Sequence, residues 1–198
     1  MPDGEIAIDD PRSADIRELL ERHLTFAHTH TPPKDVHALD IDGLLDPAVT
    51  FYSYRLDGQL LAVGALKQLD LRHAELKSMH TVQGARGRGI GRAMLNHLIA
   101  VARNRGYLRV SLETGTMEAF TPARSLYASA GFEPCGPFAD YSPSPSNTYM
   151  TLSLAGADSD AGRPAGRRND QPQPGQPYER ATGAWIELQS ASALAAAC

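Results

Sequence analysis

The chain has 198 residues and a formal net charge of −4, with 42% hydrophobic and 21% charged residues. This length and apolar content suit one globular domain with a sizeable core. The mild acidity excludes the broad basic field expected of a protein that binds nucleic acid or an anionic membrane. The start is acidic, and no run of about 18 apolar residues occurs. We therefore expect a cytoplasmic protein that is neither secreted nor membrane-bound.

The first predicted elements are a short strand at residues 6–8 and a helix from residue 13 to about residue 27. Ser13 and Asp15 are typical of a helix start. Apolar side chains recur at helical spacing on one face, at Ile16, Leu19, Leu20, Leu24 and Ala27. Prolines and an Asp-Gly pair then predict a long connection over residues 29–46, with one helical turn around residues 41–45. Connections of this length often carry function.

An antiparallel meander is predicted next. Two β-rich runs, residues 50–56 and 59–66, flank Asp57-Gly58, which is a strong hairpin signal, and residues 73–81 form the third strand. The rest of the pattern predicts a helix ending near residue 105, a strand at 108–112, a helix over 118–130, and strands at 132–133 and 148–154. The element order is therefore β-α-β-β-β-α-β-α-β-β.

The composition changes after residue 154. Residues 156–183 are rich in Gly, Pro, Asp, Arg and Gln, and such a segment cannot bury enough apolar surface to offset the entropy of ordering it. We expect one domain over residues 1–154 and a low-complexity, disordered tail over residues 155–198.

A glycine-rich segment, Arg86-Gly87-Arg88-Gly89-Ile90-Gly91, follows the third meander strand and precedes an apolar helix. Its glycines let successive backbone N–H groups approach one ligand, and the helix directs its positive dipole end there. Arg86, Arg88 and Arg92 can add charge-assisted contacts. The segment predicts a phosphate site, with a glycine-rich turn and a solvated basic face as the alternative. Its spacing fits neither a P-loop nor a dinucleotide-binding fingerprint.

Two motifs together resemble the GCN5-related N-acetyltransferase (GNAT) superfamily. Arg86-x-x-Gly89-x-Gly91 is similar to its acetyl-CoA signature Gln/Arg-x-x-Gly-x-Gly/Ala, and residues 123–132 are similar to its A-x-x-L-Y-x-x-x-G-F. The likeness covers about residues 5–154. It implies an α/β (α+β) GNAT fold: a mixed, mainly antiparallel sheet of six to seven strands flanked by about four helices. It also implies a V-shaped splay between the two central strands, residues 73–81 and 108–112.

The same resemblance implies acetyl-CoA as co-substrate. The backbone of Met79 and Thr81 would hydrogen-bond the pantetheine arm like an added strand, and the amides from Gly87 to Gly91 would hold the pyrophosphate. The cofactor-binding residues expected are Met79, Thr81, Arg86, Gly87, Arg88, Gly89, Ile90, Gly91 and Arg92. Phe120 departs from the pattern, because many members carry an asparagine there that contacts the pantetheine arm.

The resemblance also implies catalytic residues. Tyr127 stands at the position of the family's general acid, and its alternative role is a helix tyrosine packed on Phe132. Glu75 stands where some members carry a glutamate base, and the two-residue strand period places its side chain on the face of Lys77, Met79 and Thr81. An edge-exposed charge is the alternative for Glu75. Glu113, at the end of the next strand, is an equal candidate for the base, and a water-mediated proton path is the third option.

The seven histidines and two cysteines predict no metal site. His28-x-His30 has no Cys, Asp or Glu partners at a recognisable ligand spacing, so packing or surface roles are the better account. In the fold implied, the loop after the first helix closes over the acceptor, which makes His28, His30 and His37 candidate substrate contacts. Cys135 is expected to be a half-buried thiol rather than a nucleophile.

These observations predict an N-acetyltransferase that moves the acetyl group of acetyl-CoA to a primary amine of a small molecule or peptide. Direct attack in a ternary complex is expected, because no cysteine or serine is placed to hold the acyl group. Transfer of a longer acyl group and a non-catalytic acyl-CoA sensor are the alternatives. The identity of the acceptor, the choice between monomer and homodimer, and the role of residues 155–198 stay open.

Overall fold

The computed structural model describes residues 4–154, so the expected disordered tail lies outside the described residues. In chain order the helices and strands are β1 (Glu5–Ile8), α1 (Ala14–His30), α2 (Ile41–Leu44), β2 (Val49–Leu56), β3 (Gln59–Gln68), β4 (His73–Thr81), α3 (Ile90–Asn104), β5 (Arg109–Gly115), α4 (Thr121–Ala128), β6 (Glu133–Cys135) and β7 (Asn147–Ser153). Three short 3₁₀ turns, Pro33–Asp35, Gln83–Ala85 and Glu118–Phe120, connect them. No helix within residues 4–154 is long and apolar enough to span a membrane.

The strands form one seven-stranded sheet in the order β1-β2-β3-β4-β5-β7-β6. All neighbours are antiparallel except β4 and β5, which confirms the predicted mixed, mainly antiparallel sheet. Asp57 and Gly58 both have positive φ, at 50° and 78°, as a two-residue type I′ turn requires. The predicted hairpin between β2 and β3 is therefore confirmed.

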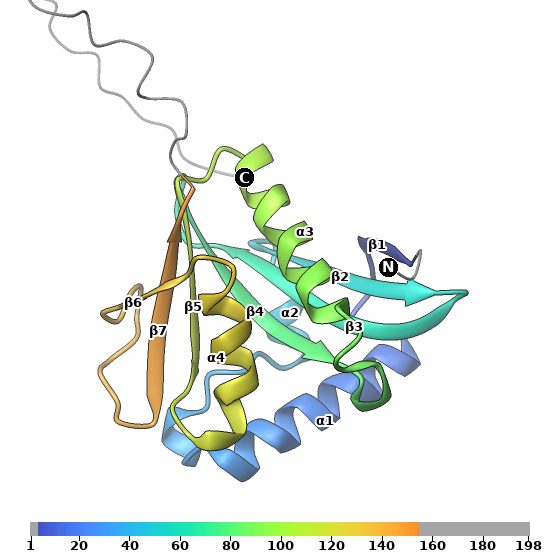
Figure 1. Cartoon of the computed structure of the whole chain (residues 1–198), viewed down its shortest axis with the longest axis horizontal. Coiled ribbons are helices and arrows are strands. Elements are labelled where there is room, and N and C mark those ends of the chain that lie inside the picture. Colours follow the sequence, from blue (N-terminus) through green and yellow to red (C-terminus); the bar gives the residue numbers. More distant parts are fainter. Residues whose placement is uncertain (1–3, 155–198) are drawn as a thin grey trace, which may run out of the picture. The chain divides into compact units, whose positions relative to one another are not determined.

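Helices α3 and α4 cover one face of the sheet and α1 covers the other (Figure 1). Side chains alternate between the two faces and build a core on each. The larger core lies under α3 and α4 and includes Met94, Leu95 and Leu98. The smaller core lies under α1, where Ile16, Leu19 and Leu20 pack on β2 and β3. The predicted apolar face of the first helix is thus buried against the sheet.

Leu98 is fully buried in the larger core, which yields a prediction for stability. Leu98→Ala removes buried methyl groups and leaves a cavity, and we expect it to lower the free energy of unfolding by about 2–5 kcal/mol. Urea denaturation followed by circular dichroism measures this loss. Asn96→Ala, at an exposed position of the same helix, is the matched control. An unchanged unfolding midpoint for Leu98→Ala would show that this helix does not contribute to the core as described.

The two central strands separate, which confirms the predicted splay. β4 and β5 pair at only three positions, the last being Glu75 with Ser111, although β4 continues to Thr81 and β5 to Gly115. Beyond that pair the facing edges of both strands leave the parallel ladder. The sheet therefore opens at its centre, next to the start of α3 and to α4 (Figure 1).

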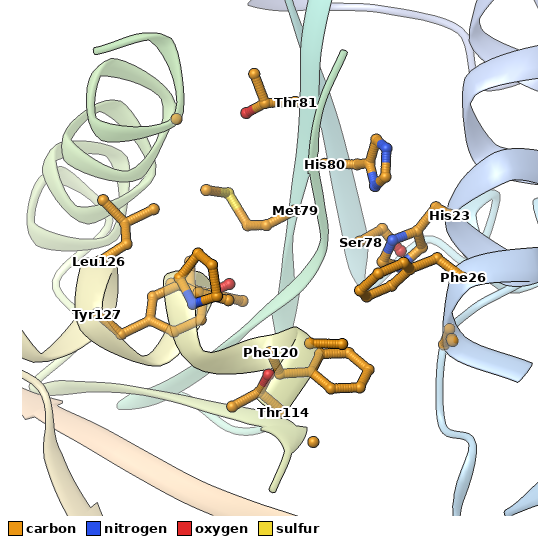
Figure 2. A pocket seen from close by; sticks show the side chains of 18 of the residues that line it. His23, Phe26, Ser78, Met79, His80, Thr81, Thr114, Phe120, Leu126 and Tyr127 are labelled. Carbon is orange, nitrogen blue, oxygen red and sulfur yellow. The ribbon is translucent and has the colours of Figure 1, made fainter. Parts of the chain in front are cut away.

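A β-bulge in β4 corrects one prediction. Ser78 has φ 51°, and the β3–β4 register shifts so that Val63 pairs with His80 while Ala65 pairs with Lys77. The extra residue resets the alternation of side chains. Met79 and Thr81 consequently point toward α3 and α4, away from the face that carries Lys77, whereas Ser78 and His80 point toward α1 (Figure 2). The predicted common face for Glu75, Lys77, Met79 and Thr81 is wrong for the last two.

Several element ends differ from prediction by one or a few residues. α1 continues to His30 and stops before Pro32, which disfavours helical geometry in the residue that precedes it. Ser13 makes no side-chain cap, and Asp15 accepts a hydrogen bond from the N–H of Ile16 instead. The helix predicted over residues 118–130 splits into a 3₁₀ turn and α4, which has Pro122 in its first turn. β5 extends past the predicted end and includes Glu113.

Candidate active site

A cavity of about 580 Å³ lies at the splay of the sheet. Its walls come from β4 and β5, the side of α1, the start of α3, α4, and the segment after α1 (Figure 2). Of the predicted site residues, the cavity is lined by His37, Met79, Thr81, Arg86, Gly87, Gly89, Ile90, Gly91, Arg92, Glu113 and Tyr127. Four other predicted site residues do not belong to this lining within residues 4–154: His28, His30, Glu75 and Arg88.

The glycine segment forms one end of the cavity. Gly87 and Gly89 have φ values of 74° and 82°, a conformation that L side chains rarely adopt. Gly89 is the N-terminal cap of α3, a helix of 15 residues, so the first amides of α3 are free of intrahelical partners. A Cβ at Gly91 would come within 3.2 Å of Thr81 Oγ1. The backbone here fits a cradle for an anionic group.

Two arginines frame this end. Arg86 Nε donates to the carbonyl oxygen of Thr81 at 3.3 Å, and Arg92 donates to the hydroxyl of Ser129, the C-terminal cap of α4. Both guanidinium groups are held by neighbours next to the glycines. Arg88 is exposed and lies outside the cavity lining, so the three predicted arginines are not equivalent.

Tyr127 of α4 faces the middle of the cavity (Figure 2). Its ring lies 5.9 Å from that of Phe132, so the packing role and the cavity role coexist. Burial and the charge of Glu113 raise the pKa of the Tyr127 phenol well above its usual value. The hydroxyl therefore stays protonated at physiological pH and can act as a proton donor.

Glu113 of β5 also lines the cavity. Burial raises the pKa of this carboxyl to about 7, the charge of Lys77 opposes the shift, and Glu75 and Asp35 reinforce it. A carboxyl that titrates near neutral pH can both accept and release a proton under physiological conditions. Of the two predicted bases, Glu113 lines the cavity and Glu75 does not.

Glu75 is placed differently from both predictions for it. The residue is 3% exposed, so it is not an edge-exposed charge. Its Oε1 accepts a hydrogen bond of 2.5 Å from the Tyr141 hydroxyl and lies 3.4 Å from Lys77 Nζ. Tyr141, from the loop before β7, and Lys77 thus both contact the Glu75 carboxylate. Glu75 acts here as the anchor of a buried network rather than as a wall of the cavity.

Lys77 and Tyr141 are site residues that the sequence did not reveal. Lys77 Nζ donates to the Tyr141 hydroxyl at 2.8 Å and to the carbonyl oxygen of His37 at 2.9 Å. These contacts join β4 to the connection after α1 and to the loop before β7. No local pattern signals them, because the bond between Tyr141 and Glu75 spans 66 residues of chain.

The histidines have separate roles. His37 lines the cavity and packs edge-on against Tyr141, 5.0 Å between ring centroids. His28 is exposed, and His30 packs on Phe26 at 4.6 Å, outside the cavity lining. Neither of these two lines the cavity, and a substrate contact by either stays a prediction.

Two further histidines, not predicted as site residues, do line the cavity. His23 and His80 make an edge-to-face pair with 5.3 Å between ring centroids. Burial lowers the pKa of each to about 4, so both rings are neutral at physiological pH. His23 lies on the buried side of α1. This position was the feature of the sequence that could have identified it as a site residue. Within residues 4–154, no three His, Cys, Asp or Glu side chains group as a metal site.

Phe120 forms the wall where the family pattern has an asparagine. Its ring covers the backbone of Gly115, where an added Cβ would meet ring atoms at 2.5 Å. The same ring packs against Phe26 of α1 with 5.1 Å between centroids. An aromatic wall therefore stands at the position where the sequence departs from the family pattern (Figure 2).

Comparison with known proteins identifies related sequences over the domain. The model of the acetyltransferase (GNAT) family matches residues 13–132. The uncharacterized N-acetyltransferase YsnE of Bacillus subtilis is 44% identical over 149 residues, 75% of this chain and 99% of that protein. The uncharacterized N-acetyltransferase YedL of Escherichia coli is 41% identical over 149 residues, 75% of this chain and 94% of that protein.

Solved structures share the fold. A Klebsiella pneumoniae protein proposed to be an acyl-CoA N-acyltransferase has a TM-score of 0.65 at 24% identity, over 78% of this chain and 100% of that one. A Bacillus subtilis acetyltransferase in complex with CoA has a TM-score of 0.59 at 17% identity, over 77% and 99% of the two chains. A GNAT family acetyltransferase from Elizabethkingia anophelis with bound acetyl-CoA has a TM-score of 0.55 at 16% identity, over 78% and 100%. With the family match and the two close relatives, the chain belongs to the acetyltransferase (GNAT) family.

Proposed function

We propose that this protein uses acetyl-CoA to acetylate a primary amine. The observation that carries the proposal is that Glu113 and Tyr127, a carboxyl with a pKa of about 7 and a protonated phenol, line the cavity that reaches the glycine segment. The relatives named N-acetyltransferases support the same chemistry. Two structurally similar acetyltransferases hold CoA or acetyl-CoA, which supports the choice of co-substrate.

We assign the co-substrate to the half of the cavity between β4 and α4. The amides at the start of α3, with Arg86 and Arg92, would hold its phosphates. The edge of β4 at Met79 and Thr81, beyond the last pair with β5, would receive the extended pantetheine arm as an added strand. Met79 points toward α4 and Thr81 toward the start of α3 (Figure 2), so the arm would run from the start of α3 between β4 and α4 and bring the thioester to Tyr127.

In this reaction Glu113 takes one proton from the attacking amine, and the amine nitrogen bonds to the thioester carbonyl carbon. Tyr127 gives a proton to the sulfur as the carbon–sulfur bond breaks. The products are an amide and free CoA, and solvent restores the protonation states of both side chains. Direct transfer to the amine is proposed, because among residues 4–154 the cavity lining contains no cysteine, and its serine, Ser78, stands on the α1 side of β4.

The arginine assignment gives a prediction with an internal control. Arg86 lines the cavity and Arg88 does not. We expect Arg86→Gln to raise the KM for acetyl-CoA by roughly 10-fold, the size of one charge-assisted hydrogen bond to phosphate, with little change in kcat. Arg88→Gln should leave this KM close to that of the wild type. Equal effects of both substitutions would mean that the arginines act only through a general basic field.

Release of the CoA thiol, measured with acetyl-CoA and a panel of primary amines, tests the proposed function. The expected result is amine-dependent release that is faster with acetyl-CoA than with longer acyl-CoA thioesters. Faster release with a longer thioester would assign a different acyl donor. Tight acetyl-CoA binding without release for any amine would instead indicate a sensor.

A further inference from the structure

The acceptor half of the cavity, between α1, β4 and β5, holds three charged side chains: Asp35, Lys77 and Glu113. Glu113 is assigned to proton transfer, which leaves the roles of Lys77 and Asp35 open. The hydrogen-bond and ion-pair partners of these two side chains indicate which kind of acceptor this half of the cavity suits.

The ammonium group of Lys77 is already engaged by protein groups. An ammonium group has three N–H bonds. Lys77 Nζ lies 2.8 Å from the Tyr141 hydroxyl, 2.9 Å from the carbonyl oxygen of His37 and 3.4 Å from Glu75 Oε1. The charge of Lys77 is therefore compensated by Glu75, and an acceptor carboxylate would have to displace one of these contacts.

Asp35, in contrast to Lys77, has a side-chain atom without a hydrogen-bond partner among residues 4–154. Its backbone is fixed, since its N–H donates to the carbonyl oxygen of Pro32 at 2.8 Å and its carbonyl oxygen accepts from Asn147 Nδ2 at 3.0 Å. The residue is 8% exposed and lines the cavity, yet its Oδ2 is buried and has no hydrogen-bond partner among residues 4–154. An unpaired buried carboxylate oxygen is costly unless a cationic or N–H donor completes it.

Among residues 4–154, the lining of the acceptor half contains no lysine or arginine besides Lys77, and Arg86 and Arg92 stand at the glycine end of the cavity. His23 and His80 are neutral because burial holds the pKa of each at about 4. Phe26 and Phe120 add aromatic surface to the lining, and the faces of aromatic rings attract organic cations. Carboxylate and aromatic groups together favour an ammonium or guanidinium group over a neutral or anionic one.

We propose that Asp35 binds a second cationic group of the acceptor, so that the substrate is a diamine or a similar amine with two cationic ends, one of which is acetylated beside Glu113. This inference rests on the proposed function. It adds the chemical class of the acceptor and names Asp35 as the residue that selects it.

A matched set of linear amines tests the proposal. Butylamine, diaminobutane and aminobutyrate share one carbon chain and differ only in the charge at the far end. Acetylation rates are measured for the three, and for the corresponding sets with three to six carbons, with wild type, Asp35→Asn and the control Asp42→Asn. Asp42 is exposed on the same segment of chain. Calorimetric titration of each diamine in the presence of CoA provides a readout that does not depend on transfer.

We expect the wild type and Asp42→Asn to prefer the best diamine over its monoamine by roughly 10- to 100-fold in kcat/KM, the range for a hydrogen bond to a charged group. Asp35→Asn should lose this preference, measured as the ratio of kcat/KM for the diamine to kcat/KM for the monoamine, and circular dichroism shows whether the variant is folded. A wild type that acetylates diamines and monoamines at equal rates, or that prefers the amino acids, would overturn the inference and leave the proposed function standing.

If no amine is acetylated, the proposed function fails, and the calorimetric titrations still test the role of Asp35. Diamine binding that weakens in Asp35→Asn supports the role of Asp35, and binding that is equal in both proteins overturns it.

Discussion

Replacing Glu113 by glutamine is expected to lower kcat/KM for the amine by roughly 100- to 1,000-fold, within the range that a positioned general base contributes. The substitution keeps the size and shape of the side chain and removes its ability to accept a proton from the amine. Because burial raises the pKa of Glu113, its ionised form destabilises the native state above neutral pH, so the variant should unfold at no lower temperature than the wild type. A loss of rate can then be separated from a loss of folded protein.

The pH dependence of the same pair of proteins identifies the base. Glu113 accepts a proton only when it is ionised, and its pKa is about 7. The wild-type kcat/KM should therefore fall as the pH is lowered through about 7. In Glu113→Gln this fall should disappear, and only the pH dependence caused by ionisation of the amine substrate should remain. Glu133→Gln, on the exposed face of β6, serves as the control. A fall that persists in Glu113→Gln would assign the proton to another group or to water.

Tyr127→Phe is the second change with a large expected effect. It keeps the ring that packs on Phe132 and removes the hydroxyl that donates to the departing sulfur, and we expect kcat to fall by about 100-fold. The affinity for acetyl-CoA should change little, because the variant retains the cavity wall. Steady-state kinetics separates kcat from KM, and calorimetry measures co-substrate binding.

Tyr107→Phe is the matched control, since Tyr107 is a buried tyrosine of the same core that does not line the cavity. It should leave kcat close to the wild-type value. If Tyr127→Phe also leaves kcat unchanged, the hydroxyl is not the proton donor, and Tyr127 contributes only packing.

Local rules predicted most of the fold. The hairpin followed from Asp57-Gly58, because few residue pairs accept positive φ at both positions. The start of α3 followed from its glycines, which suit the left-handed backbone at Gly87 and Gly89. In both places the conformation depends on neighbours in sequence, so the sequence contains the needed information.

The bulge at Ser78 could not be predicted in the same way. Serine is not a residue that signals positive φ, and the shift arises from the pairing of β4 with β3 around Gly64. One unpredicted residue therefore moved Met79 and Thr81 to the opposite face from Lys77. Alternation rules apply only while the register is unbroken.

The choice between Glu75 and Glu113 was also beyond sequence, because it depends on contacts between distant segments. Tyr141 covers Glu75 from a loop 66 residues away, whereas Glu113 keeps its place in the cavity beside Lys77. Asp35 was missed for the same reason. Its unpaired oxygen becomes visible only when the folded chain shows that no partner reaches it within residues 4–154.

Mass spectrometry of the acceptor after incubation with the protein and isotopically labelled acetyl-CoA tests the proposed reaction most directly. We predict that the labelled acetyl group appears on the amine nitrogen in step with CoA release. The mass of the protein itself should not change, and the label should appear far more slowly with Glu113→Gln. A labelled protein that forms before the labelled amine, or bound acetyl-CoA that yields no labelled amide with any primary amine, would contradict direct transfer in this cavity.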